Sequence, residues 1–172
     1  AKYNKTTDNF TRYISKDTSF GRPPCNEIIS LMESSQGVLW AGTWYGGLAR
    51  FDNKTGKFSY YFGEGDTLTI PRIRTLFQRT ANSFYLGSDD GLYTFNTTTG
   101  ECVPTDDDKN KESIYACCQD REGGIWIGTY FSGVNYLSPK HKDFEWYYLN
   151  GSENSLSGNV ISQFCEDSDG NI

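Results

Sequence analysis

The stretch Ile125–Thr129 reads Ile-Trp-Ile-Gly-Thr, and the chain repeats it in altered form at two earlier places. One copy is Leu39–Thr43, with the sequence Leu-Trp-Ala-Gly-Thr. The other is Tyr-Leu-Gly-Ser at residues 85–88. Each copy has an aromatic residue, an apolar residue, a glycine and a hydroxyl residue in the same order. A pattern that returns at a fixed period indicates a repeat architecture, so its flanks decide which one.

The residues around the three aromatic anchors, Trp40, Tyr85 and Trp126, keep a common register. An isoleucine stands twelve residues before each anchor, an apolar residue or cysteine nine before, a turn residue three before, and a glycine six or seven after. These residues are Ile28, Ile73 and Ile114; Leu31, Leu76 and Cys117; Gly37, Asn82 and Gly123; and Gly47, Gly91 and Gly133. A fourth copy begins with Ile161 and Phe164, and Phe10 and Ile14 match the closing strand of an earlier copy.

Each repeat predicts four short strands separated by turn signals. In the first full repeat they cover residues 26–33, 38–43, 48–52 and 58–62, with Ile28 and Leu31 facing the core. Four-stranded units at a period of 41–45 residues favour an all-β fold of β-propeller blades over a β-solenoid, whose rungs are shorter. We therefore expect a partial propeller of three full repeats, with partial blades at both ends. The predicted segments are a closing strand in 1–20, blades at 26–62, 71–103 and 113–148, and the start of a further blade at 159–172.

Composition limits the partners of this stretch. The 172 residues carry a formal net charge of −6 and the pI is near 4.8. Nucleic acids and anionic membrane surfaces bind basic patches, so neither is expected as a direct partner. No run approaches the roughly 18–20 apolar residues that span a bilayer. The stretch looks excised from a longer chain. We expect it to be connected to a membrane only through other parts of that chain. Its open ring of blades also predicts some self-association.

Side chains for catalysis or metal binding are scarce. His141 is the only histidine, which argues against a histidine-based triad or a zinc site. The five cysteines show no zinc-type spacing, and most are expected to be small buried residues. Residues 167–170 resemble part of a calcium loop but align with a turn in the preceding repeat, so an ordinary turn is predicted. Residues 106–108 are interpreted as a solvated loop, with a bound cation as the alternative. We expect no catalytic residue, metal or cofactor.

The whole repeat, Ile-x-x-apolar, a spacer, Gly-x-apolar-Trp-apolar-Gly-Thr and Gly-Gly-apolar, resembles the two-component regulator propeller repeat. Ile125–Thr129 and Leu39–Thr43 carry the resemblance most plainly. The second repeat departs from it with Tyr85 for Trp, Ser88 for Thr and the single glycine Gly91. The resemblance implies a many-bladed periplasmic propeller, an immunoglobulin-like domain, a membrane helix and a histidine kinase. Hybrid forms add a receiver and an AraC-type DNA-binding domain.

That resemblance also implies a function. In Bacteroides-type bacteria such proteins sense oligosaccharides and switch on glycan-utilisation genes. We therefore expect this stretch to belong to the extracytoplasmic sensor of a hybrid two-component histidine kinase, in the periplasm. An oligosaccharide is its expected ligand.

A propeller places the loops between second and third strands, and those between blades, on one face. In this chain these loops combine aromatic rings with charged groups, which suits the C–H patches and hydroxyls of a sugar. The candidate ligand-binding residues are Trp44, Tyr45, Arg72, Asp89, Asp90, Tyr130 and Phe131. The alternative is that the four aromatic residues among them pack against neighbouring blades.

Two other functions stay open at this point. A protein-interaction scaffold would bind a partner through blade faces or edges and would take no small ligand. A propeller carbohydrate-active enzyme would need two carboxylates roughly 5–10 Å apart across a pocket. Asp89 or Asp90 could supply one of them, but no motif places a second acid.

Overall fold

The computed structural model describes residues 1–14, 25–62, 67–70, 72–105, 111–140 and 144–172. These residues form two compact units, 1–72 and 73–172. The predicted loop at 106–108 and His141 lie outside the described residues. All the secondary structure elements assigned in the described part of the chain are β-strands. The described residues hold no helix of the length and hydrophobicity that a membrane crossing requires.

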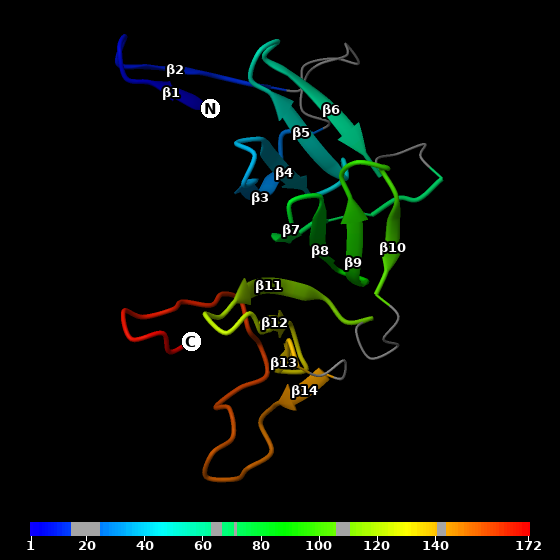
Figure 1. Cartoon of the computed structure of the whole chain (residues 1–172), viewed down its shortest axis with the longest axis vertical. Coiled ribbons are helices and arrows are strands. Elements are labelled where there is room, and N and C mark those ends of the chain that lie inside the picture. The colour runs from blue at the N-terminus through cyan, green and yellow to red at the C-terminus, as the bar shows by residue number, and fades with distance from the viewer. Residues whose placement is uncertain (15–24, 63–66, 71, 106–110, 141–143) are drawn as a thin grey trace. The chain divides into compact units, whose positions relative to one another are not determined.

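The first unit contains a hairpin and a four-stranded antiparallel blade (Figure 1). The hairpin pairs β1 (Lys2–Asn4) with β2 (Asn9–Thr11). The blade runs in spatial order through β3 (Ile28–Glu33), β4 (Leu39–Thr43), β5 (Leu48–Asp52) and β6 (Lys57–Tyr61). Three of these strands differ from the predicted ranges by one or two residues at an end, because turn residues define a strand terminus only approximately.

Residues 1–20 hold more than the single closing strand expected from the sequence. Phe10 lies in β2, but β2 is the second arm of a hairpin, and Ile14 lies beyond its end. In the turn of this hairpin, the Asn4 side chain accepts a hydrogen bond from the Thr6 N–H at 2.9 Å. Asp8 takes a positive φ of 49° in the same turn. A turn without glycine or proline gives a weak signal in the sequence. Residues 15–20 lie outside the described part.

The second unit holds two blades with the same strand order. One comprises β7 (Thr75–Thr80), β8 (Ser83–Ser88), β9 (Gly91–Asn96) and β10 (Cys102–Pro104). The other comprises β11 (Ile114–Gln119), β12 (Ile125–Thr129), β13 (Val134–Leu137) and β14 (Phe144–Tyr147). Neighbouring strands are antiparallel throughout. Three four-stranded antiparallel sheets with flanking partial repeats confirm the predicted all-β fold of propeller blades.

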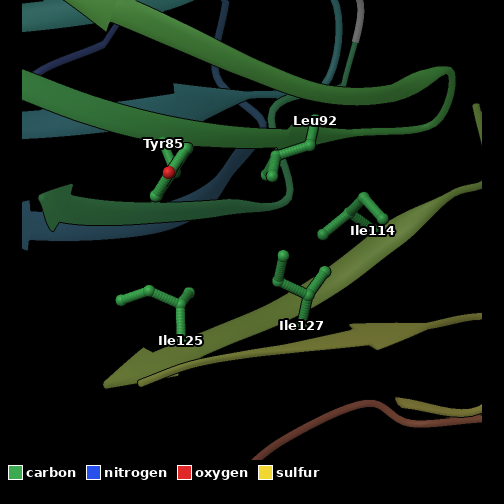
Figure 2. Packing of buried hydrophobic residues seen from close by; sticks show 5 residues of the cluster. All are labelled: Tyr85, Leu92, Ile114, Ile125 and Ile127. Carbon is green, nitrogen blue, oxygen red and sulfur yellow. The ribbon is translucent and has the colours of Figure 1, made fainter. Parts of the chain in front are cut away.

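A hydrophobic cluster joins the two blades of the second unit (Figure 2). Tyr85 and Leu92 project from the earlier blade toward Ile114, Ile125 and Ile127 of the later one. Ile114 and Ile127 are fully buried. Burial of one such side chain is worth about 2 kcal/mol, so this cluster is a main source of cohesion between the blades.

Ile28 and Leu31, which the sequence predicts in the core, are instead 41% and 66% exposed. Their equivalents in the third repeat, Ile114 and Cys117, pack against the blade before them. Burial at this repeat position is therefore supplied by the preceding blade rather than by the strand's own sheet. Among the described residues of the first unit, the only strands assigned before β3 are those of the β1–β2 hairpin.

The glycines of the second and third repeats that precede the hydroxyl residue, Gly87 and Gly128, lie against the next repeat. A Cβ on Gly87 would lie 2.7 Å from Cγ2 of Ile114, and one on Gly128 would lie 2.6 Å from Cγ2 of Ile161. Both isoleucines are the first of their repeats. No strand is assigned in 159–172, yet Ile161 sits on Gly128 as Ile114 sits on Gly87, and its N–H donates to the Thr129 carbonyl at 2.9 Å.

An arginine fastens the last described segment to the blade before it. The Arg121 side chain pairs with Glu166 at 2.7 Å and donates to the carbonyls of Asp167 and Ser168 at 3.2 and 3.1 Å. Asp167 closes the following turn by accepting from the backbone N–H groups of Asp169 and Asn171, each at 2.9 Å.

The cysteines differ in their environments, and none forms a disulfide. Burial raises the pKa of Cys102 to about 12. Burial and the nearby carboxylates of Asp120 and Glu166 raise the pKa of Cys118 to about 11. The pKa of Cys117 is also raised, by burial first and then by Cys118. Cys25, Cys102, Cys117 and Cys118 are half-buried and Cys165 is exposed, so the expectation that most of the cysteines are buried is only partly met.

Gly47 and Gly56 allow the effect of a close contact with neighbouring backbone to be separated from the effect of a left-handed φ. Gly47 and Gly56 have φ values of +69° and +68°, but a Cβ on Gly47 would lie 2.7 Å from the carbonyl carbon of Phe62, whereas one on Gly56 meets nothing within 4 Å. We expect Gly56→Ala to lower the free energy of unfolding by about 1 kcal/mol, the cost of a left-handed φ. Gly47→Ala should cost about 3 kcal/mol or more, since backbone must also move. Urea unfolding of both variants measures this, and equal losses would contradict the close approach.

Thiol labelling tests the burial of the cysteines. The thiolate is the reactive form, so exposed Cys165 should react first with a disulfide reagent at about pH 8, while Cys102 and Cys117 should react only after denaturant is added. Peptide mapping of the labelled chain identifies the sites. Cys165→Ser should remove the fast phase. Rapid native labelling of Cys117 would show that the cluster around it is open.

Candidate functional site

A buried hydroxyl holds each loop between the second and third strands. Thr129 Oγ1 donates to the Gly133 carbonyl at 2.9 Å and accepts from the Ser132 N–H at 2.8 Å. Thr43 makes the same two bonds in the first repeat, to Gly47 at 2.9 Å and from Gly46 at 2.8 Å. Ser88 bonds to the Gly91 carbonyl at 3.2 Å in the shorter loop of the second repeat. The residues just after each hydroxyl are therefore presented in a fixed conformation, and they are the predicted site residues.

In the first unit the structure brings together the three candidate residues Trp44, Tyr45 and Arg72. The Arg72 guanidinium lies 4.7 Å from the ring centroid of Trp44 and 6.0 Å from that of Tyr45. The two rings meet edge to face with centroids 6.1 Å apart. Arg72 has a left-handed φ of 55°, and its N–H donates to the Trp44 carbonyl at 3.0 Å. The backbone thus holds the guanidinium over the indole, a cation–π arrangement.

The two acidic candidates of the second repeat play different parts. Asp89 forms an ion pair with Arg74, and the two side chains are only 20% and 14% exposed. Asp90 instead turns back into its own loop, where it accepts from the Ser88 hydroxyl and, at 3.0 Å, from the Tyr93 hydroxyl. Burial, together with the hydrogen bond and negative charge of Asp90, raises the pKa of Tyr93 to about 12. Asp90 therefore stabilises the loop, while Asp89 fixes an arginine.

Tyr130 and Phe131 continue a row of side chains that starts at Asp89. The Arg74 guanidinium lies 4.2 Å from the ring centroid of Tyr115, and Tyr115 stacks on Tyr130 with centroids 4.8 Å apart and planes 21° apart. Tyr130 then meets Phe131 edge to face at 4.3 Å. Phe131 is 71% exposed, so the row ends in an aromatic ring that faces solvent.

The sequence prediction leaves out Arg74 and Tyr115, which support this row. Both directly follow the first isoleucine of their repeat, and the residues at the same position in the first and last repeats are Ile29 and Ser162. The isoleucine is constant between repeats, whereas the next residue changes from apolar to charged to aromatic to polar. A position that varies beside an invariant core position is the signal that could have identified them.

The exposure of the candidate aromatic residues bears on whether they only pack against blades. Phe131 and Tyr45 are largely exposed, while Trp44 is half-buried beneath Arg72.

Among the described residues no three His, Cys, Asp or Glu side chains come close enough together to hold a metal ion.

The repeats match a known family model in sequence. Residues 23–45 and 108–131 match the model described as two component regulator propeller. These two segments are similar to that propeller repeat. They begin the repeats anchored by Trp40 and Trp126, while the repeat with Tyr85, which departs most from the pattern, is not matched. A comparison with curated protein sequences gives no match.

Several solved structures resemble this chain. The extracellular domain of BT4673 from B. thetaiotaomicron, described as a one-component system, has a TM-score of 0.78 at 21% identity, over 98% of this chain and 22% of that one. The extracellular domain of BT3049 from the same organism, described as a hybrid two-component system, has a TM-score of 0.62 at 19% identity, over 98% of this chain and 28% of that one. The WD40 β-propeller domain of Doa1 has a TM-score of 0.60 at 14% identity, over 83% of this chain and 45% of that one. The chain spans less than a third of the two extracellular domains, and these similarities show a β-propeller fold.

The buried hydroxyl of Thr129 can be tested for its effect on the loop that carries Tyr130 and Phe131. Thr129→Val keeps the shape but leaves the Ser132 N–H without its acceptor, so the free energy of unfolding should fall by about 1–3 kcal/mol. Thr129→Ser keeps the hydroxyl and should cost less than Thr129→Val. Chemical denaturation measures both. If the two variants lose the same stability, the hydroxyl does not hold the loop.

Proposed function

We propose that this chain is part of the extracytoplasmic ligand-sensing domain of a hybrid two-component system, and that its ligand is an oligosaccharide. The repeat family and the resemblance to extracellular domains of B. thetaiotaomicron systems support the sensor. The parent protein is then a histidine kinase that controls glycan-utilisation genes, with this domain in the periplasm. Association of sensor regions passes the signal across the membrane.

The observation that carries the ligand proposal is the row that ends in Tyr130 and Phe131. An exposed ring on a rigid support packs well against the C–H face of a sugar, because little side-chain entropy is lost on binding. The Trp44, Tyr45 and Arg72 cluster offers the same combination in the first unit.

A protein partner is the second candidate, and an exposed apolar patch favours it. Tyr147, Tyr148 and Leu149, at the end of the outermost strand β14, are 42%, 49% and 48% exposed. Contiguous exposed apolar side chains often mark protein interaction sites. The backbone of Tyr147 and Tyr148 lies against Gly133 of the Tyr130 loop. The two candidates are therefore distinguished by their sensitive side chains, which are those of Tyr147, Tyr148 and Leu149 for a protein partner and those of Tyr130 and Phe131 for a sugar.

Calorimetric titration of the intact parent sensor region with a panel of oligosaccharides tests the proposal. One glycan class should bind, and Trp44→Ala or Tyr130→Ala should weaken binding about tenfold or more, since a well-placed aromatic contact contributes on the order of 1–2 kcal/mol. Tyr60→Ala is the matched control, because Tyr60 and Tyr130 are both 37% exposed and Tyr60 lies on the outermost strand β6.

The outcomes separate the candidates. Binding that survives both site variants would place the ligand on other blades of the parent. Absence of binding to every glycan would overturn the sugar sensor and favour the protein-interaction scaffold.

A further inference from the structure

The ring of Tyr115 has two close neighbours. The guanidinium carbon of Arg74 lies 4.2 Å from the ring centroid, and Tyr130 stacks on the ring at 4.8 Å and 21°. Arg74 and Tyr130 therefore occupy ring surface of Tyr115 that a ligand would need for stacking. The surface left for contact is at the end of the row, on Tyr130 and above all on Phe131, which is 71% exposed.

The charge of Arg74 is balanced inside the protein. Its guanidinium Nε pairs with Asp89 Oδ1, and both side chains are mostly buried. An anion that approached Arg74 would also meet the Asp89 carboxylate, so the local field offers it little net attraction. Breaking such a partly buried pair to bind another anion removes the interaction between Asp89 and Arg74, which is costly. The overall charge of −6 repels anions further.

We infer that Arg74 is a positioning residue that fixes Tyr115 and Tyr130, and that the site formed by Tyr130 and Phe131 takes an uncharged sugar ring rather than an acidic one. This inference rests on the proposed oligosaccharide sensor and specifies its ligand. Asp89 orients Arg74, Arg74 holds Tyr115, and Tyr115 holds Tyr130 next to the exposed Phe131. The aromatic end of the row receives the C–H face of the ring, and the charged end stays inside the protein.

The test uses the intact sensor region and two sets of oligosaccharides of equal length, one uncharged and one containing uronic acids. The wild-type region should bind a member of the uncharged set and bind its acidic counterpart more weakly. Phe131→Ala removes the contact, and Arg74→Met removes the support beneath Tyr115. Each should weaken binding of the uncharged ligand roughly tenfold, the scale of one aromatic or cation–π contact.

Two further variants distinguish positioning from a merely structural role. Arg74→Lys keeps a cation beside Asp89 and over Tyr115, and it should restore most of the affinity that Arg74→Met loses. Asp89→Asn leaves Arg74 with an unbalanced charge, so the ratio of affinities should shift several-fold toward the acidic oligosaccharide. General loosening of the fold would not change this ratio. Thermal unfolding of each variant shows that it remains folded.

The possible results separate this inference from the proposed function. Preference of the wild type for acidic oligosaccharides, lost in Arg74→Met, would show that Arg74 contacts an anion and would overturn the inference while the sugar sensor stands. Uncharged binding that survives both Phe131→Ala and Arg74→Met would also overturn it and leave the sensor intact. Absence of binding to either set would overturn the sensor and this inference together.

Discussion

The contact between a glycine of one repeat and the first isoleucine of the next is the constraint on which the rest of the blade structure depends. At Gly87 and Gly128 there is no room for a Cβ, because Ile114 and Ile161 occupy that space. Side chains of the two blades then interlock in the cluster of Figure 2. The glycine cannot vary without pushing the blades apart, and close packing of this kind resists even one added methyl group.

The hydroxyl residue that follows this glycine connects blade packing to the candidate site. Thr43, Ser88 and Thr129 are buried, and each bonds the backbone of the loop that leaves its strand. The buried, packed part of each repeat therefore ends one residue before Trp44, Asp89 and Tyr130. Because the packed residues and the candidate site residues are neighbours in the sequence, the repeats can keep a common scaffold while the side chains that follow it differ in chemistry.

Those variable residues interact across neighbouring blades rather than acting one by one. In the second unit Arg74 of one blade pairs with Asp89 of its own sheet and supports Tyr115 of the next. Tyr115 in turn supports Tyr130, which meets Phe131. The charges of Arg74 and Asp89 pair with each other inside this row, and the aromatic ring of Phe131 is exposed at its end. This arrangement suits a ligand with an apolar face. The chemistry at this end of the two blades is therefore set by the pair rather than by either blade alone.

The sequence by itself determined the all-β class, the period, and the strands of the first blade to within one or two residues, because strand alternation and turn residues are local signals. It also located the loops that carry Trp44, Tyr45, Tyr130 and Phe131. Only the tertiary structure decided which neighbours these residues meet. It separated Asp89 from Asp90, brought Arg74 and Tyr115 into the row, and showed that Ile28 and Leu31 lie open where a preceding blade covers their equivalents. Such contacts join residues far apart in the chain, and no local pattern encodes which side chains face each other across two sheets.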